Sequence, residues 1–335
     1  MLSVDVVVPC YQYGRYLREC VTSVLEQDIQ DLRVLIIDNA STDNSLEIAH
    51  KLAAEDFRVE VVAHSTNLGH HASFNEGVRW AASDFFVILC ADDLLAPGCL
   101  RRAVSFMQSH PDVHLVHGRY HSIYNHDPTP NLELHTPNTE WQIFSGKAVL
   151  EAFCQAGGRY PMGGGSVVVR TAVQKRVGFY RSELSNTDDV EMWMRFAHAG
   201  NIGKTSAVQV ITRIHPVMSS AAVGRALYAG LNWDVHFEAA LESFFANAGD
   251  SSPEIKRLHR TARRSMAGRA YWVALSNLVQ GNIRLCLDHW KFAVTRHPAI
   301  MILPPIGYLL RREDSFKRIA QIMKGAARRV RETTS

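Results

Sequence analysis

The stretch VILCADDLL, residues 87–95, decides the fold of this chain. Its first residues are apolar, and a short apolar run that ends in polar residues is typical of a strand covered on both faces. Asp92 and Asp93 follow this run directly. Because ligands bind beyond the carboxyl ends of the strands in an open parallel sheet, the two acids are placed to hold a hard divalent cation and, through it, a diphosphate.

The same two acids also have a structural interpretation. Acidic side chains are favoured at helix N-termini, so Asp92 and Asp93 would cap a helix that begins near Pro97. For an isolated motif the helix cap is the better interpretation. The surrounding sequence therefore has to decide between the two.

Two further apolar runs lie upstream and resemble the first. Residues 4–9 read VDVVVP and residues 32–38 read LRVLIID, and each run is followed by a polar or aromatic segment. The carboxyl ends of parallel strands meet at one edge of a sheet. The segments that follow Pro9, Asp38 and Asp92 would then lie at a common edge of the sheet. Their polar and aromatic side chains predict a nucleotide site there.

Helical patterns separate these runs. Apolar residues recur at i, i+3, i+4 and i+7 within residues 17–25, a similar stripe begins at Leu46, and a third helix is predicted over about residues 72–82. Strand and helix alternate through residue 110, which predicts a doubly wound parallel sheet.

Composition describes an ordinary globular protein and favours no particular partner. The chain of 335 residues is 47% hydrophobic and 21% charged, with a formal net charge of +3. Asp5 interrupts the first apolar stretch and Pro9 ends it, so we expect no signal peptide. The six cysteines show neither CxxC pairs nor zinc-finger spacing. Reduced thiols in a cytoplasmic protein are therefore expected.

Several short motifs occur in an order that resembles family 2 glycosyltransferases with a GT-A fold. The motifs are Pro9-x-Tyr11, DNASTD at 38–43, Asn67-x-Gly69 with Asn75-x-Gly77, LCADD at 89–93, DDVEMWMR at 188–195, and Arg213-x-His215. The resemblance covers about residues 1–220. Each motif alone is weak, and their common order carries the inference.

The resemblance implies an α/β fold with a GT-A, Rossmann-like sheet, mostly parallel and flanked by helices, followed by a C-terminal helical extension. We place the catalytic domain at residues 1–223, with a nucleotide-binding half at 1–110 and an acceptor half at 111–223. The helical extension occupies residues 224–335. The implied reaction is inverting transfer of a sugar from a nucleotide-diphosphate donor to an acceptor hydroxyl, in the synthesis of envelope polysaccharide or glycolipid. No nucleic-acid partner is expected.

The resemblance assigns a set of residues to the nucleotide: Pro9, Tyr11, Asp38, Asn67, Gly69, Asp92, Arg213 and His215. Asp92 and His215 are also the expected ligands of a divalent cation, Mg²⁺ or Mn²⁺. Tyr11 would stack on the base, and Asp38 would accept a hydrogen bond from an imide N–H, which favours UDP or dTDP. Cys90 departs from the Asp-x-Asp pattern that is frequent in the family. A thiol is a poor ligand for Mg²⁺, so this departure removes a carboxylate expected at the ribose.

Simpler interpretations of these positions stand beside the functional ones. Tyr11 also suits the edge of a core, and residues 39–43 suit a helix-capping turn. His215 precedes a proline, as in many plain turns.

Asp189 is the expected general base, with Asp188 as the alternative. An acceptor hydroxyl needs a carboxylate to take its proton as the new bond forms. The two acids are adjacent at a predicted helix start, so they point in different directions and only one faces the donor. Both also fit as favourable first-turn acids.

The C-terminal third is predicted to be helical, with a helix that starts at Ser252-Pro253. Residues 311–335 contain eight Lys/Arg and three Asp/Glu. An apolar stripe within this tail fits either an interfacial helix on the inner face of an anionic membrane, near a lipid-linked acceptor, or a helix packed on the protein.

Two rival functions remain beside sugar transfer. They are a nucleotidyltransferase and a non-catalytic scaffold of an envelope-assembly complex.

Overall fold

The computed structural model of the chain describes residues 3–124, 140–159, 162, 164–215, 231–249 and 252–310. The chain divides into two compact units, residues 1–150 with 161–221, and residues 151–160 with 222–335. The domain boundary predicted at residue 223 lies outside the described residues and stays a prediction. The same is true of the helix predicted within residues 311–335.

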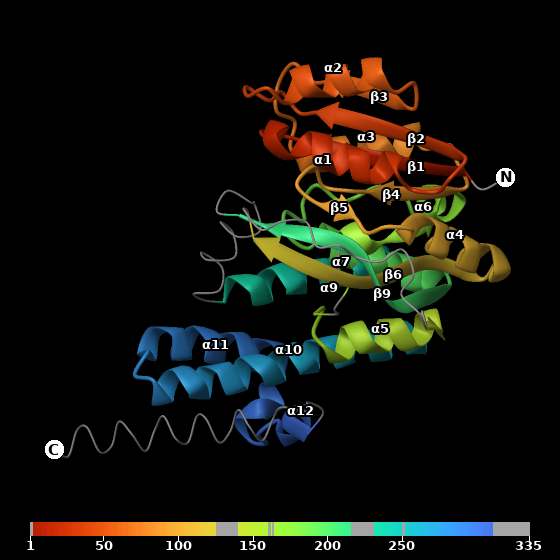
Figure 1. Cartoon of the computed structure of the whole chain (residues 1–335). Coiled ribbons are helices and arrows are strands. Elements are labelled where there is room, and N and C mark those ends of the chain that lie inside the picture. Colours follow the sequence, from red (N-terminus) through yellow and green to blue (C-terminus); the bar gives the residue numbers. More distant parts are fainter. Residues whose placement is uncertain are drawn as a thin grey trace. The chain divides into compact units, whose positions relative to one another are not determined.

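The first unit is built on a single mixed sheet. Its strands lie in the order β3-β2-β1-β4-β8-β6-β9-β5, and β7 also pairs with β9 (Figure 1). Their bounds are β1 (Ser3–Cys10), β2 (Asp31–Asp38), β3 (Val59–Ala63), β4 (Phe85–Ile88), β5 (Leu94–Leu95), β6 (Val113–Tyr124), β7 (Trp141–Phe144), β8 (Val168–Arg170) and β9 (Asn201–Ile214). Strands β1, β2 and β4 are parallel, as predicted, and β3, which was not predicted, is parallel to β2. Strand β8 is antiparallel to both β4 and β6, and β6 and β9 are parallel.

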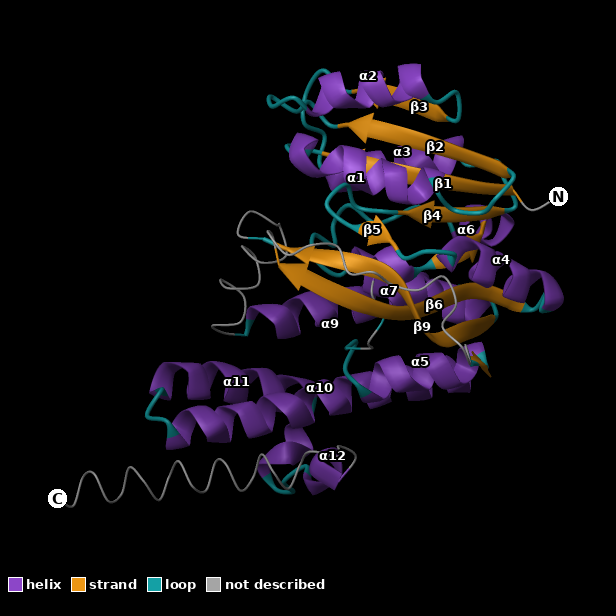
Figure 2. Cartoon of the chain, viewed as in Figure 1, coloured by secondary structure: helices purple, strands orange, loops and turns teal. Residues whose placement is uncertain are grey.

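Helices flank this sheet (Figure 2). They are α1 (Gly14–Leu25), α2 (Ser45–Glu55), α3 (His70–Trp80), α4 (Cys99–Ser109), α5 (Gly146–Gln155), α6 (Thr171–Val177) and α7 (Asp188–Ala199), with a short 3₁₀ turn η1 (Gly164–Ser166). The helices predicted within residues 1–110 are present, with boundaries shifted by a few residues. The prediction of an α/β sheet flanked by helices is confirmed.

Strand β1 shows why its sequence is apolar at nearly every position. Val4, Val6 and Val8 belong to the core cluster that also contains the buried stripe of α1. Val7 points to the other face, where a Cβ added to Gly77 of α3 would lie 2.7 Å from its side chain. Helices therefore cover both faces of this strand, and glycine at residue 77 allows α3 to approach closely.

A buried acid ties together the edge of the sheet at which the parallel strands begin. Asp5 accepts hydrogen bonds from Arg33 Nε and Nη2 at 2.9 and 2.8 Å. It also accepts from the backbone N–H groups of Ala82 and Ser83 at 2.6 and 2.8 Å, and from Ser83 Oγ at 2.8 Å. Burial alone raises the pKa of Asp5, but these donors outweigh burial and lower it below its ordinary value. This carboxylate is fully satisfied.

The second unit is helical in the residues that the structure describes, as predicted. Its elements are α9 (Asn232–Asn247), α10 (Pro253–Val279), α11 (Ile283–Arg296), η2 (Pro298–Met301) and α12 (Ile306–Leu310), preceded by the end of α5. Ser252 caps α10 by accepting a hydrogen bond from Ile255 N at 3.3 Å. Buried Asp234 pairs with Arg159 at 2.7 Å and with Arg269 at 2.8 Å, which links the segment after α5 to α9 and α10.

In the described part of the chain, no helix has both the length and the apolar character needed to cross a bilayer.

Candidate active site

The candidate site lies where the parallel strands end. Cys10 at the end of β1 is paired with Asp38 at the end of β2, and Asp38 is paired with Ala63 at the end of β3. Strand β4 runs parallel beside β1 and leads into the loop that carries Asp92. The predicted convergence of strand ends at one edge is therefore present.

At this edge Asp38 offers a hydrogen-bond acceptor that the protein leaves unused. The residue is 1% exposed, and its Oδ2 accepts from Ser41 N at 3.0 Å. Its Oδ1 is buried and has no hydrogen-bond partner. Tyr11, directly beyond β1, is 44% exposed. Since buried polar atoms are nearly always paired, Oδ1 suits a donor on a bound ligand, and the exposed ring suits a stacked base.

Asn67 and Gly69 shape the loop between β3 and α3. Asn67 Oδ1 accepts from Asn39 Nδ2 and from Gly69 N, both at 2.9 Å. Gly69 has φ +81° and directly precedes the first residue of α3, a conformation that glycine adopts without strain. Asn39 Oδ1 in turn accepts from Leu68 N and contacts the His64 ring, both at 2.9 Å. These contacts give Asn67 and Gly69 a structural role, and their contact with a donor stays a prediction.

The loop after β4 forms an acid cluster, which we define as Cys90, Asp92 and Asp93. Their ligand atoms lie within 4.8 Å of one another. Asp93 Oδ1 accepts from the backbone N–H of Arg213 at 3.1 Å. Burial, and then the charge of Asp92, raise the pKa of Asp93 to about 8. Without a cation the cluster therefore retains a proton at neutral pH.

Asp92 and His215, the two predicted metal ligands, are brought together although 123 positions separate them in the sequence. His215 Nε2 lies 3.1 Å from Asp92 Oδ2, and the residue is 2% exposed. The rings of Tyr13 and Tyr16 lie 5.6 and 5.1 Å from the imidazole, centroid to centroid. This packing fixes the imidazole against the acid cluster.

Arg213 is less suited to a phosphate than its motif implied. Its Nη2 pairs with Glu19 at 2.7 Å, and its guanidinium lies 5.0 Å from the Tyr16 ring centroid. The side chain is almost fully buried. Its charge is therefore partly neutralised within the protein, while its backbone N–H holds Asp93.

The two acids at the start of α7 lie near the acid cluster. Burial, and then the charge of Asp188, raise the pKa of Asp189 to about 7. Cys90 reaches solvent, yet the pKa of its thiol is raised well above its ordinary value, first by partial desolvation and then by Asp92, Asp93, Asp188 and Asp189. The two acidic motifs, nearly a hundred residues apart in sequence, thus converge around one cysteine.

Comparison with known sequences decides the family. The model of "Glycosyl transferase family 2" matches residues 5–175, which is 171 of the 335 residues. This chain belongs to glycosyl transferase family 2. The match includes the nucleotide edge and the acid cluster but ends before the start of α7.

A curated relative in this family is glycosyltransferase GlyG of Streptococcus pneumoniae, which is 33% identical over 124 residues. The alignment covers 37% of this chain and 40% of that protein. The chain thus spans less than half the length of this relative, and the resemblance is confined to the shared part.

Solved structures show the same fold over most of the chain. S. aureus TarS 1–349 in complex with UDP-GlcNAc has a TM-score of 0.55 and 17% identity, covering 90% of this chain and 92% of that one. Mannosyltransferase PcManGT from Pyrobaculum calidifontis, in complex with GDP-Man and Mn²⁺, has a TM-score of 0.53 and 17% identity, covering 97% and 85%. These similarities confirm the predicted GT-A fold.

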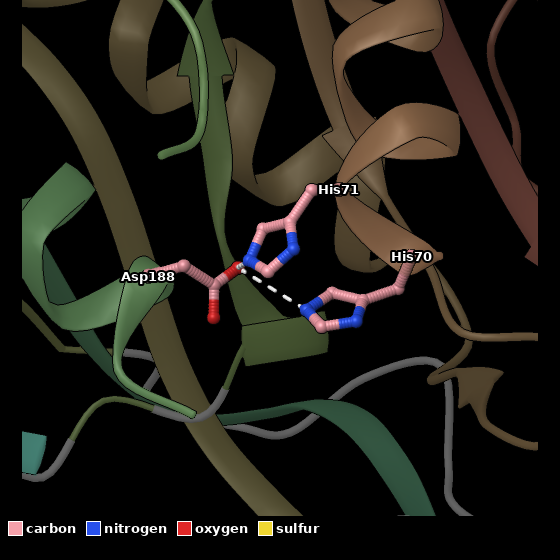
Figure 3. A group of neighbouring side chains, drawn as sticks. All are labelled: His70, His71 and Asp188. Carbon is pink, nitrogen blue, oxygen red and sulfur yellow. Dashed lines mark ion pairs between the residues drawn. The ribbon is translucent and has the colours of Figure 1, made fainter. Parts of the chain in front are cut away.

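Within this family fold, two features of the site were missed by sequence analysis. Glu191 is fully buried and accepts from Arg181 Nε at 3.0 Å and from Arg195 Nη2 at 2.7 Å, which anchors the first turn of α7. His70 and His71, at the start of α3, point toward Asp188 (Figure 3). Burial, and then the charge of His70, lower the pKa of His71. Glu191 had been noted only as part of the acidic motif, and the adjacent histidines had no assigned role.

Proposed function

We propose that this chain is an inverting glycosyltransferase that moves a sugar from a nucleotide-diphosphate donor to an acceptor hydroxyl. The observation that carries the proposal is the convergence of Asp92, Asp93, Asp188 and Asp189 around Cys90. One acidic motif follows a strand at the nucleotide edge, and the other supplies a carboxyl whose pKa is about 7. Donor diphosphate binding and proton removal need these two groups side by side.

The nucleoside would bind at the ends of β1 and β2. Asp38 Oδ1 lacks a partner and accepts the imide N–H of uracil or thymine, and Tyr11 provides a stacking face. Guanine also has an N–H donor, but next to an exocyclic amine, so it needs a wider acceptor than one oxygen atom. UDP and dTDP sugars are therefore the favoured donors.

The residues of the acid cluster fit a divalent cation. Asp92 supplies a carboxylate that is 3.1 Å from His215 Nε2, and the pKa of Asp93 is raised first by burial and then by the charge of Asp92. Carboxylate and imidazole together suit Mn²⁺ and tolerate Mg²⁺. When bound, such an ion neutralises charge that develops on the leaving diphosphate. Asp92 and His215 would hold it.

Asp189 would take the proton of the acceptor hydroxyl as the bond to the anomeric carbon forms. A carboxylate on the side of the sugar opposite the leaving diphosphate gives inversion in a single displacement. A pKa of about 7 makes Asp189 a stronger base than an ordinary aspartate while leaving a large fraction ionised at neutral pH. Asp188 remains the alternative base.

Synthesis of envelope polysaccharide or glycolipid, with a glycan or lipid-linked acceptor, is the proposed setting. The basic composition of residues 311–335 supports peripheral attachment at the cytoplasmic face of the membrane. Sedimentation with anionic vesicles tests the attachment. The full chain should sediment at low salt and remain in solution at high salt, and a chain truncated after residue 310 should not sediment. Full-length protein that stays in solution with anionic vesicles at low salt would contradict the attachment.

The donor is tested by thermal shift with UDP, dTDP and GDP sugars, each with Mn²⁺ and with a chelator. A ligand at 100 times its Kd stabilises the folded state by about 2.7 kcal/mol. The true donor should therefore give the largest increase in Tm. In calorimetry, UDP should bind the Asp92→Ala variant as weakly as it binds wild-type protein in the presence of a chelator. Equal wild-type affinity with and without Mn²⁺ would contradict a metal-dependent site.

A further inference from the structure

A second group of potential metal ligands lies apart from the acid cluster in sequence and differs from it in chemistry. It consists of His70 and His71 at the start of α3 and Asp188 at the start of α7. Figure 3 shows both imidazoles directed at the Asp188 carboxylate. The acid cluster offers two carboxylates and a thiol, whereas this group offers two imidazoles and one carboxylate.

The distances fit an ion between these groups better than direct contact. Asp188 Oδ2 lies 3.5 Å from His71 Nε2 and 3.8 Å from His70 Nε2. A charged hydrogen bond to a carboxylate is about 2.7–2.9 Å long, so both separations are too wide. Around a tetrahedral zinc ion with bonds of about 2.0–2.1 Å, ligand atoms lie roughly 3.3–3.5 Å apart. The two carboxylate–imidazole separations are therefore close to those around such an ion, and the ligand atoms of all three residues lie within 4.8 Å of one another.

The surroundings allow an ion to enter and to be held. The side chains of Asp188 and His71 are 9% and 12% exposed, and that of His70 is 48% exposed. The site is thus closed on the Asp188 side and open on the His70 side. The two imidazole rings lie 3.8 Å apart, centroid to centroid, with 36° between their planes. The two rings would have to move apart for both to bind one tetrahedral ion.

His71 has one competing contact. Its Nε2 lies 3.3 Å from the carbonyl oxygen of Leu184. This long hydrogen bond holds the ring in the metal-free protein. An ion would replace it, because the same nitrogen cannot donate a proton and bind a metal at once.

We propose that His70, His71 and Asp188 form a second cation site, which takes a borderline transition ion such as Zn²⁺. Imidazole ligands favour Zn²⁺ over Mg²⁺, so the site is chemically distinct from the one proposed at Asp92 and His215. Three protein ligands leave a fourth position open to water or to a ligand hydroxyl. Bound there, the ion neutralises the charge next to Asp189.

The test measures binding to the full chain, independently of sugar transfer. Protein stripped with a chelator and returned to buffer with excess Mg²⁺ is titrated with Zn²⁺ by calorimetry. A parallel titration with Co²⁺ records the absorption bands of a tetrahedral site. We expect two Zn²⁺ equivalents in wild type, one at Asp92 and His215 and one at this site, with a tetrahedral Co²⁺ spectrum from this site. His71→Ala and His70→Ala should each weaken Zn²⁺ binding at this site by at least ~10-fold.

Two controls separate this site from others. His50→Ala removes an exposed imidazole on α2 and should bind as wild type does. Asp92→Asn disables the acid cluster and should lose one Zn²⁺ equivalent while retaining the other and its tetrahedral Co²⁺ spectrum. His70 is exposed enough for its replacement to leave folding intact, as circular dichroism checks. Unchanged Zn²⁺ affinity in the His70→Ala variant, or loss of the tetrahedral Co²⁺ spectrum in Asp92→Asn alone, would overturn the proposal.

Discussion

The two edges of the same sheet treat buried carboxylates in opposite ways. At the edge where β1 begins, Asp5 accepts hydrogen bonds from a guanidinium, two backbone N–H groups and a hydroxyl, and its pKa is lowered. At the edge where the parallel strands end, Asp93 has a pKa of about 8. In the neighbouring α7, Asp189 has a pKa of about 7.

The difference lies in what surrounds each acid. Asp5 is surrounded by donors, so the folded protein stabilises its charge. Asp93 and Asp189 are desolvated with fewer donors, and each also lies beside another acid, so the folded protein resists their ionisation. A buried acid that accepts from many donors is typical of structure, and a buried pair of acids with raised pKa is typical of a site that binds a cation, a proton or a substrate. The predictions below test that distinction, from the largest expected effect to the smallest.

The largest effect is expected from Asp189→Asn. Loss of a general base should reduce kcat by ~10²–10⁴-fold while the affinity for the nucleotide stays nearly unchanged. Because the raised pKa means that ionised Asp189 destabilises the folded state, the variant should unfold at pH 8 with a free energy equal to or above that of wild type. Steady-state kinetics and urea melts measure both. A wild-type kcat would move the base to Asp188, which the corresponding Asp188→Asn variant checks.

The reverse pattern is expected for Asp5→Ala. Its backbone and guanidinium donors lose a buried acceptor, so the free energy of unfolding should fall by about 3 kcal/mol. In protein that remains folded, kcat and the KM for the donor should match wild type. Chemical denaturation and kinetics at a temperature below the transition measure the two quantities. A variant with wild-type stability and reduced kcat would refute the proposed division between the two edges.

The pH dependence of transfer gives a smaller effect. Since the pKa of Asp189 is raised to about 7, the carboxyl is protonated below that pH and cannot accept a proton. With Mg²⁺ as the added cation, kcat should fall about tenfold per unit of pH below 7 and level off above it. Assays between pH 5.5 and 8.5 give the profile. An inflection near the ordinary aspartate pKa would show that another group is the base.

The smallest effect concerns the nucleotide. Asp38→Ala removes an acceptor for one hydrogen bond, which corresponds to about 1–1.5 kcal/mol, or roughly 5–10-fold in the Kd for UDP. Asp31→Ala is the matched control, since Asp31 is exposed at the opposite end of the same strand. In calorimetry, the Asp31→Ala control should bind UDP with the wild-type Kd. Equal losses in both variants would indicate a general charge effect instead of a specific contact.

The nucleotide half of the fold could be predicted because its signals are local. The runs at residues 4–9 and 32–38 are apolar at nearly every position since helices cover both faces of the strands. Strand β3 was not predicted, because VEVVA is short and only partly buried. The mixed second half was also not predicted: the pairing of β8 with both β4 and β6 joins segments more than 50 residues apart, and no local pattern encodes it.

The candidate site divides in the same way. Residues that directly follow strands, such as Asp38 and Asp92, could be placed from sequence because strand ends share an edge. The role of His70 and His71 depends on a contact with Asp188, more than a hundred residues away. Adjacent histidines at a helix start carry no such information by themselves. The assigned catalytic and ligand roles stay predictions until the variants are measured.

The shortness of β8 affects how firmly the two halves of the sheet are joined. This three-residue strand shares two residue pairs with β4 and two with β6, whereas β1 and β2 share eight. Few hydrogen-bonded residue pairs therefore join β4 to β6 through β8, and we call this connection the seam. Asp92 follows the strand on one side of the seam, and His215 follows β9 on the other. Strand β5, which begins two residues after Asp92, pairs directly with β9, so the acid cluster and His215 stay joined when the seam opens, and amide exchange at residues 168–170 would report on the seam alone.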